Sequence, residues 1–229
     1  MLPAYNEQDN IERAVRSALA ACAPLVPSLE IVAVDDGSRD RTGEILRGLE
    51  AELGARLRVV RHERNQGYGA ALRHGFLASR GELVFYTDSD NQFDLAEMAG
   101  FLPLMDEYDA VLGYRVDRQD PWLRRFVSGG FNGLSSLVLG VRVRDLNCSF
   151  KLMRGDALRA LPLETADFFI DTELVARLHR AGWRYTQRGV RHYPRTAGRS
   201  TVRPGDVPRT LVSLARMWAR LRQAPPRPA

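Results

Sequence analysis

Two aspartates one residue apart follow an apolar segment and could bind a divalent cation. Asp88 and Asp90 come directly after residues 83–87 (LVFYT), which have the composition of a β-strand. Alternate residues of an extended segment point to the same side, so both carboxylates are expected to converge on one hard ion, Mg²⁺ or Mn²⁺. Two protein oxygens leave most of an octahedral shell to water and substrate phosphates. The spacing therefore indicates a metal site that acts on a diphosphate-bearing substrate.

A second acidic pair closes another apolar run. Asp35 and Asp36 follow residues 31–34 (IVAV) and precede Gly37-Ser38. A turn that caps the next helix would account for Ser38 or Asp40 alone, but two adjacent carboxylates in a desolvated site repel unless they bind donors such as a base, a ribose or a cation. Open α/β sheets bind ligands beyond the carboxyl ends of their strands, which is where both acidic groups are predicted to lie.

The elements that would position these acids alternate along the chain. Short β-rich runs alternate with amphipathic runs, which predicts β-α units and a largely parallel sheet. The predicted strands are 30–34, 57–61, 83–87 and 110–114, and the predicted helices are 7–21, 40–53, 69–79 and 94–105. Pro3 comes so early that the strand expected at the start is either cut off or missing. After residue 114 this alternation ends. The chain continues with a basic segment (115–125), an uncharged helix candidate (126–141), a predicted strand near 148–153 and a predicted helix over 171–181.

Composition limits the class of protein. With 229 residues, 45% of them hydrophobic and 27% charged, the chain is expected to fold into one compact α/β domain. The net charge of +5 rests almost wholly on arginine, because Lys151 is the only lysine, so a lysine-rich nucleic-acid arm is not expected. The two cysteines, Cys22 and Cys148, cannot form a disulfide framework and are expected to be buried thiols. Neither a secretory signal nor a membrane-spanning segment is expected.

Four motifs occur in an order that points to a known family. They are Pro3–Glu7 (PAYNE), Val34–Thr42 (VDDGSRDRT), Asn65–Leu72 (NQGYGAAL) and Asp88–Gln92 (DSDNQ). Together they resemble the family-2 glycosyltransferases, and most of all the dolichol-phosphate and polyprenyl-phosphate sugar transferases. The resemblance implies a GT-A, Rossmann-like nucleotide-sugar-binding fold with a mixed, mostly parallel sheet, an inverting sugar transfer, and Mg²⁺ or Mn²⁺ as cofactor.

The resemblance also implies a domain organisation. Residues 1–205 would form a single GT-A domain, with a nucleotide-sugar half over 1–114 and an acceptor half over 115–205. Residues 206–222 would form an amphipathic helix, and the Pro-rich segment 223–229 a disordered tail.

Roles in donor binding follow from the same resemblance. The residues implied to line the nucleotide pocket or to meet the base or ribose are Pro3, Tyr5, Glu7 and Asp36. The residues implied to contact the nucleotide or ligate the metal are Asp88, Asp90 and Gln92. The glycine-rich segment 65–69 opens a predicted helix, and it suits a close-packed backbone turn and a ligand contact equally well.

The acceptor half carries arginines and further acids. By resemblance, Arg115 and Arg125 hold an acceptor phosphate, and Asp145 either organises arginines or acts as a catalytic base. A phosphate acceptor is already anionic at neutral pH and needs no strong base, whereas a sugar hydroxyl would need a carboxylate such as Asp145 or Glu173. Flanked by arginines, residues 126–141 are interpreted as an interfacial helix pair beside a lipid carrier, with an ordinary core helix as the alternative.

A segment near the end resembles a loop that reaches the donor diphosphate in this family. In residues 192–200 (HYPRTAGRS), Arg195 and Ser200 match the Arg and Ser of that loop. Thr201 stands where a common form of the pattern has lysine, and Arg199 or Arg203 could supply the missing charge.

The motifs predict an enzyme that moves a sugar from a nucleoside-diphosphate sugar to a polyprenyl phosphate, with Asp90, Arg115 and Asp145 as its catalytic residues. The alternatives are a transferase acting on a glycan or glycolipid hydroxyl, a sugar-1-phosphate nucleotidyltransferase, and an inactive nucleotide-binding module. The expected location is cytoplasmic, with any contact to the membrane peripheral or through a membrane-protein partner.

Overall fold

The computed structural model of the chain describes residues 1–116, 130, 133, 135–195, 214, 215, 217 and 219. Its first half is a parallel sheet in the order β1-β2-β3, built from Leu2–Ala4, Ile31–Asp35 and Leu57–Arg61. Helix α1 (Ile11–Cys22) connects β1 to β2, and α2 (Thr42–Leu53) connects β2 to β3. Helix α3 (Tyr68–Ala78) then leads to β4 (Leu83–Tyr86).

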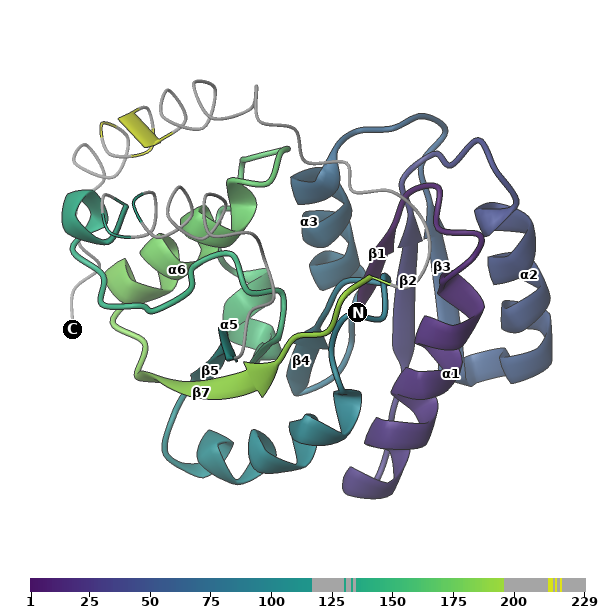
Figure 1. Ribbon diagram of the computed structural model, residues 1–229, viewed down its shortest axis with the longest axis horizontal. Coiled ribbons are helices and arrows are strands. Elements are labelled where there is room, and N and C mark those ends of the chain that lie inside the picture. Colours follow the sequence, from purple (N-terminus) through teal and green to yellow (C-terminus); the bar gives the residue numbers. More distant parts are fainter. Residues whose placement is uncertain are drawn as a thin grey trace.

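Strand β2 is buried on both sides because helices cover both faces of this sheet (Figure 1). Ile31 and Ala33 pack with α1 and α2, whereas Val32 and Val34 pack against α3. An unbroken apolar run of this kind is what a central parallel strand requires. It places Asp35 and Asp36 at the carboxyl edge of the sheet.

The second half is a mixed sheet in the order β4-β6-β5-β7. Strand β6 (Lys151–Arg154) is antiparallel to both neighbours, β4 and β5 (Ala110–Val116), and β7 (Tyr185–Arg191) is parallel to β5. Helices α5 (Gly155–Arg159) and α6 (Ile170–Arg180) follow β6. The Met1 nitrogen donates to the Phe85 oxygen at 2.7 Å and the Thr87 amide to the Met1 oxygen at 3.3 Å, so β1 lies beside β4 and the two sheets meet.

The predicted α/β class is confirmed, and two predicted elements are corrected. The strand expected to be missing is present as β1, whose three buried residues are too few to show a periodicity in the sequence. The helix predicted over 94–105 is two 3₁₀ helices, η3 (Leu95–Gly100) and η4 (Leu102–Asp106). Pro103 at the start of η4 lacks the amide hydrogen that a continuous α-helix would use there. Both cysteines are buried free thiols, as expected.

The glycines at the start of α3 allow two backbones to touch. The Gly69 amide donates to the Ala166 oxygen at 2.8 Å, and a β-carbon on Gly69 would overlap the Thr165 carbonyl oxygen. Gly67 has φ of +97°, and a β-carbon on it would overlap the Ala166 carbonyl oxygen. This geometry favours the close-packed turn over a ligand contact for residues 65–69.

Gly69→Ala is expected to destabilise the chain by about 3 kcal/mol, because the new methyl meets a backbone carbonyl that cannot rotate away. Gly48→Ala is the matched control, since it lies in α2 with no atom within 4 Å of the added carbon and is expected to stabilise by about 1 kcal/mol. Urea unfolding of the two variants measures both effects, and equal midpoints would refute the packing argument.

The described part of the second half ends in helical residues. Leu214 and Met217 pack against Phe169 and Ala176 of the α6 region, with Val138 and Leu139 alongside. The four described residues between 214 and 219 are helical, and the rest of the helix predicted over 206–222 lies outside the described residues. No helix among the described residues is long and apolar enough to cross a bilayer.

Candidate active site

The loops that follow β1, β2 and β4 meet at one edge of the sheet and are tied together by hydrogen bonds. The Asn6 amide donates to Ser38 Oγ at 3.0 Å, and the Glu7 amide donates to Thr42 Oγ1 at 2.8 Å. Ser89 Oγ donates to the Pro3 carbonyl oxygen at 2.6 Å. These bonds bring the first, second and fourth sequence motifs to one place, beyond the carboxyl ends of the strands that precede them.

Asp88 is held between two hydroxyl groups. Tyr68 Oη donates to Asp88 Oδ1 at 2.9 Å, and Ser149 Oγ donates to Oδ2 at 2.6 Å. Burial, and then the neighbouring Asp90 carboxylate, raise the pKa of Asp88 to about 7. A cation bound beside Asp88 would oppose both effects and favour the charged carboxylate.

Asp90 lies in a turn and not on an extended strand, so the geometric reason given for its convergence with Asp88 is wrong. Ser89 points inward to Pro3 between the two acids, and Asn91 has φ of +58°. The carboxylates are still close enough for Asp90 to raise the pKa of Asp88. Burial also raises the pKa of Asp90 itself, against the effect of Arg195.

Arg195 reaches this turn from the far end of the described chain. Its guanidinium pairs with Glu7 Oε1 and lies 3.8 Å from Asp90 Oδ2. Burial raises the pKa of Glu7, whose other oxygen accepts a bond of 2.7 Å from Asn10. Gln92 Nε2 donates to the Tyr193 oxygen at 2.8 Å, which holds the segment before Arg195 against the turn.

The side-chain oxygens of this site suit a hard cation. Among the described residues no cluster of three or more His, Cys, Asp or Glu side chains could by itself hold a metal. Two half-buried carboxylates with raised pKa values are nevertheless what Mg²⁺ or Mn²⁺ uses when substrate phosphates complete the shell. Asp88 and Asp90 therefore fit the predicted metal. The Nε2 of Gln92 is bonded to Tyr193, and the role of its side-chain oxygen as a third ligand stays a prediction.

Asp36 is used to hold a loop. Its carboxylate accepts from His62 Nδ1 at 2.6 Å, from the Gln66 amide at 2.8 Å and from the Gly67 amide at 2.9 Å. His62 Nε2 in turn meets His74 Nδ1 at 2.7 Å. The predicted contact of Asp36 with a base or ribose would add to this internal role and stays a prediction.

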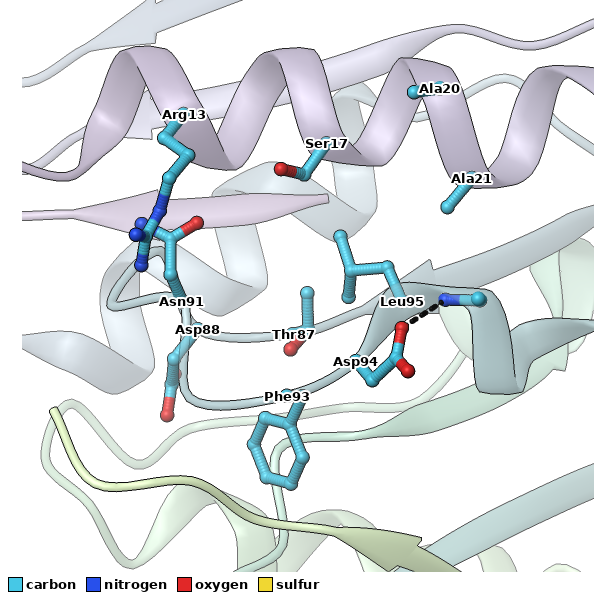
Figure 2. A pocket seen from close by; sticks show the side chains of 11 residues that line it. Arg13, Ser17, Ala20, Ala21, Thr87, Asp88, Asn91, Phe93, Asp94 and Leu95 are labelled. Carbon is cyan, nitrogen blue, oxygen red and sulfur yellow. Dashed lines mark hydrogen bonds between the residues drawn. The ribbon is translucent and has the colours of Figure 1, made fainter. Parts of the chain in front are cut away.

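The remaining residues predicted for the nucleotide pocket lie near the same edge. Pro3 is buried in β1, and Tyr5 is half-buried just beyond that strand. A cavity of about 480 Å³ opens between α1 and residues 87–96 (Figure 2). Of its lining side chains, Asp88 was predicted for the site, whereas Arg13, Ser17 and Asn91 were not.

Arg115 and Asp145 form a two-pronged ion pair in the second half of the chain. Arg115 Nε lies 2.7 Å from Asp145 Oδ2, and Nη2 lies 2.9 Å from Oδ1. This geometry agrees with Asp145 as an acid that organises an arginine. Arg125, Ser200, Arg199 and Arg203 lie outside the described residues, as does much of 126–141.

Glu173 is not an accessible base. Its side chain is fully buried and accepts from the Glu164 amide at 3.1 Å, the Thr165 amide at 2.8 Å and Arg177 Nε at 2.6 Å. It fixes the loop that precedes α6, which corrects its prediction as a candidate base for a hydroxyl acceptor. Burial and bonding to three donors leave it no free route to a substrate proton.

Sequence reasoning missed a buried cation beside the site. Lys151 is fully buried, and its Nζ donates to Asp171 Oδ1 at 2.7 Å, Tyr86 Oη at 3.0 Å and the Cys148 oxygen at 2.5 Å. A single lysine inside the apolar run 150–153 (FKLM) was the available signal, because lysine is rarely buried without partners.

Comparison with known proteins identifies the family. The family model described as "Glycosyl transferase family 2" matches residues 1–161. An undecaprenyl-phosphate 4-deoxy-4-formamido-L-arabinose transferase from Edwardsiella ictaluri is 37% identical over 70% of this chain and 50% of its own length. Glycosyltransferase AglD from Haloferax volcanii is 35% identical over 82% of this chain and 31% of its own. The chain thus spans half or less of these relatives.

Solved structures share the fold. Mannosyl-3-phosphoglycerate synthase from Rubrobacter xylanophilus matches with a TM-score of 0.70 and 19% identity, over 97% of this chain and 72% of that one. Glucosyl-3-phosphoglycerate synthase from Mycobacterium tuberculosis, in complex with Mn²⁺, uridine diphosphate and glucosyl-3-phosphoglycerate, matches with a TM-score of 0.65 and 22% identity over 93% and 77%. These matches confirm the expected GT-A-like fold. With the family model covering most of its length, the chain belongs to glycosyl transferase family 2.

Proposed function

We propose that the chain is an inverting, metal-dependent glycosyltransferase that moves a sugar from a nucleoside-diphosphate sugar to a polyprenyl phosphate. The observation that carries the proposal is the pair Asp88 and Asp90, half-buried at the carboxyl edge of the sheet with raised pKa values and with Arg195 alongside. Relatives named as undecaprenyl-phosphate sugar transferases support the acceptor class.

The roles of the side chains follow from their charges. Asp88 and Asp90 would hold Mg²⁺ or Mn²⁺, which when bound offsets the charge that grows on the leaving diphosphate. Arg195, which lies 3.8 Å from Asp90 Oδ2, would meet the same diphosphate. Arg115, kept in orientation by Asp145, would bind the acceptor phosphate so that its oxygen approaches the anomeric carbon opposite the leaving group. One such in-line displacement inverts that carbon.

A panel assay tests the proposal. The full chain is freed of metal with EDTA and incubated with nucleotide sugars and a polyprenyl phosphate, with and without Mn²⁺. We expect release of a nucleoside diphosphate and formation of a polyprenyl-phosphate sugar only when Mn²⁺ is added. Transfer to a glycan hydroxyl would favour the other acceptor class, and release of pyrophosphate would favour a nucleotidyltransferase. Donor binding without turnover would indicate an inactive module.

A further inference from the structure

Asp88 and the two hydroxyl groups that donate to it come from three separate parts of the chain. Tyr68 stands at the first turn of α3, and Ser149 lies just before β6, so they are 20 and 61 residues from Asp88 in sequence. Each donates to a different oxygen of the same carboxylate, at 2.9 and 2.6 Å. A carboxylate that accepts one bond on each oxygen cannot rotate freely, and each oxygen keeps a lone pair for another partner.

Tyr68 is itself fixed by a neighbouring loop. Its ring stacks on Phe168, with 5.3 Å between ring centroids and an interplanar angle of 26°. The same loop contacts the Gly67–Gly69 backbone through Ala166 and is held to α6 by Glu173. The position of the Tyr68 hydroxyl is therefore set by contacts with the acceptor half of the chain.

The backbone around Ser149 is also held in place by buried neighbours. Cys148 and Phe150 on either side are fully buried, and Phe150 packs against Phe85 and Phe101. Two residues further on, the ammonium group of Lys151 donates to the Cys148 carbonyl oxygen, and this fixes the backbone before Ser149. The Ser149 hydroxyl is thus presented from the core of the mixed sheet.

We propose that Tyr68 and Ser149 are positioning residues that orient the Asp88 carboxylate for a divalent cation and link that site to the acceptor half. The inference rests on the proposed function, because it takes Asp88 as part of a metal site. Outer partners that hydrogen-bond a ligating carboxylate commonly change metal affinity by 10- to 100-fold when removed. Neither hydroxyl needs to touch substrate for this effect.

Removal of each hydroxyl alone tests the proposal. Tyr68→Phe keeps the ring that stacks on Phe168, and Ser149→Ala removes one oxygen from a buried site. The Kd for Mn²⁺ is measured on the full chain by the electron paramagnetic resonance signal of free Mn²⁺, alone and with UDP or GDP. We expect the Kd for Mn²⁺ to be about 10-fold higher in each variant and higher still in the double variant. Nucleotide affinity without metal should stay unchanged.

Tyr185→Phe is the matched control, because Tyr185 Oη pairs with His179 Nδ1 at 3.3 Å and takes no part in the bonds that hold Asp88. Its Kd for Mn²⁺ should equal that of the unaltered chain. If Tyr68→Phe and Ser149→Ala, with unchanged melting temperatures, also bind Mn²⁺ within twofold of the unaltered chain, the positioning role is overturned. If the unaltered chain binds no Mn²⁺ with either nucleotide, the metal-dependent function itself fails, and this inference fails with it.

Discussion

Asp90→Ala is expected to lower the rate of sugar transfer by at least about 10³-fold, the loss typical when a group that stabilises charge in the transition state is removed. The substitution leaves Asp88 as the one carboxylate of the pair. It also removes the 3.8 Å contact between the Arg195 guanidinium and the Asp90 carboxylate. A single carboxylate binds Mg²⁺ or Mn²⁺ weakly, so the leaving diphosphate would lose its counter-charge.

The measurement is a steady-state assay of nucleoside diphosphate release at several Mn²⁺ concentrations, together with donor binding by calorimetry. Metal-dependent donor binding should vanish along with turnover. Asp106→Ala is the control, because Asp106 is an exposed acid at the end of η4, outside the turn that carries Asp88 and Asp90, and should leave both quantities unchanged. Full activity in Asp90→Ala would remove the basis for the metal assignment.

Much of the first half of the chain could be predicted because its signals are local. Strand β2 reads as an apolar run closed by two acids, and the structure places Asp35 at its end. The pair Asp88 and Asp90 was found from its position after β4, although the turn geometry differs from the extended segment expected. Local patterns suffice here because each motif directly follows the strand that positions it.

The elements that escaped prediction depend on distant contacts. Strand β7 (YTQRGVR) lacks an apolar alternation and is defined by its pairing with β5. Tyr68 and Ser149 reach Asp88 only after the chain has folded, so no spacing in the sequence relates them. Glu173 looked like an acid at a helix start, yet its bonds to residues 164 and 165 give it a structural role. Tertiary contacts of this kind override what a short window of sequence indicates.

Arg115→Lys is expected to lower kcat/KM for the polyprenyl phosphate by about 10²-fold while donor affinity stays unchanged. A lysine keeps the charge but loses the planar fork that bonds Asp145 at 2.7 and 2.9 Å and that suits a phosphate. Arg16→Lys is the matched control, because Arg16 makes a similar two-pronged pair with Glu52, at 2.8 Å in both bonds, on the exposed face of α1. Its kinetics should equal those of the unaltered chain.

Asp145→Asn separates the two roles left open for that acid. If Asp145 organises Arg115, its amide variant should raise KM for the phosphate acceptor much as Arg115→Lys does, because one oxygen of the two-pronged pair becomes a donor that repels the guanidinium. If it is a catalytic base, kcat should fall with KM unchanged. A phosphate acceptor brings its own anionic oxygen, so the first pattern is the one we expect. The second pattern, obtained with a polyprenyl phosphate, would show that the ion pair serves proton transfer and would reverse the roles assigned to these two residues.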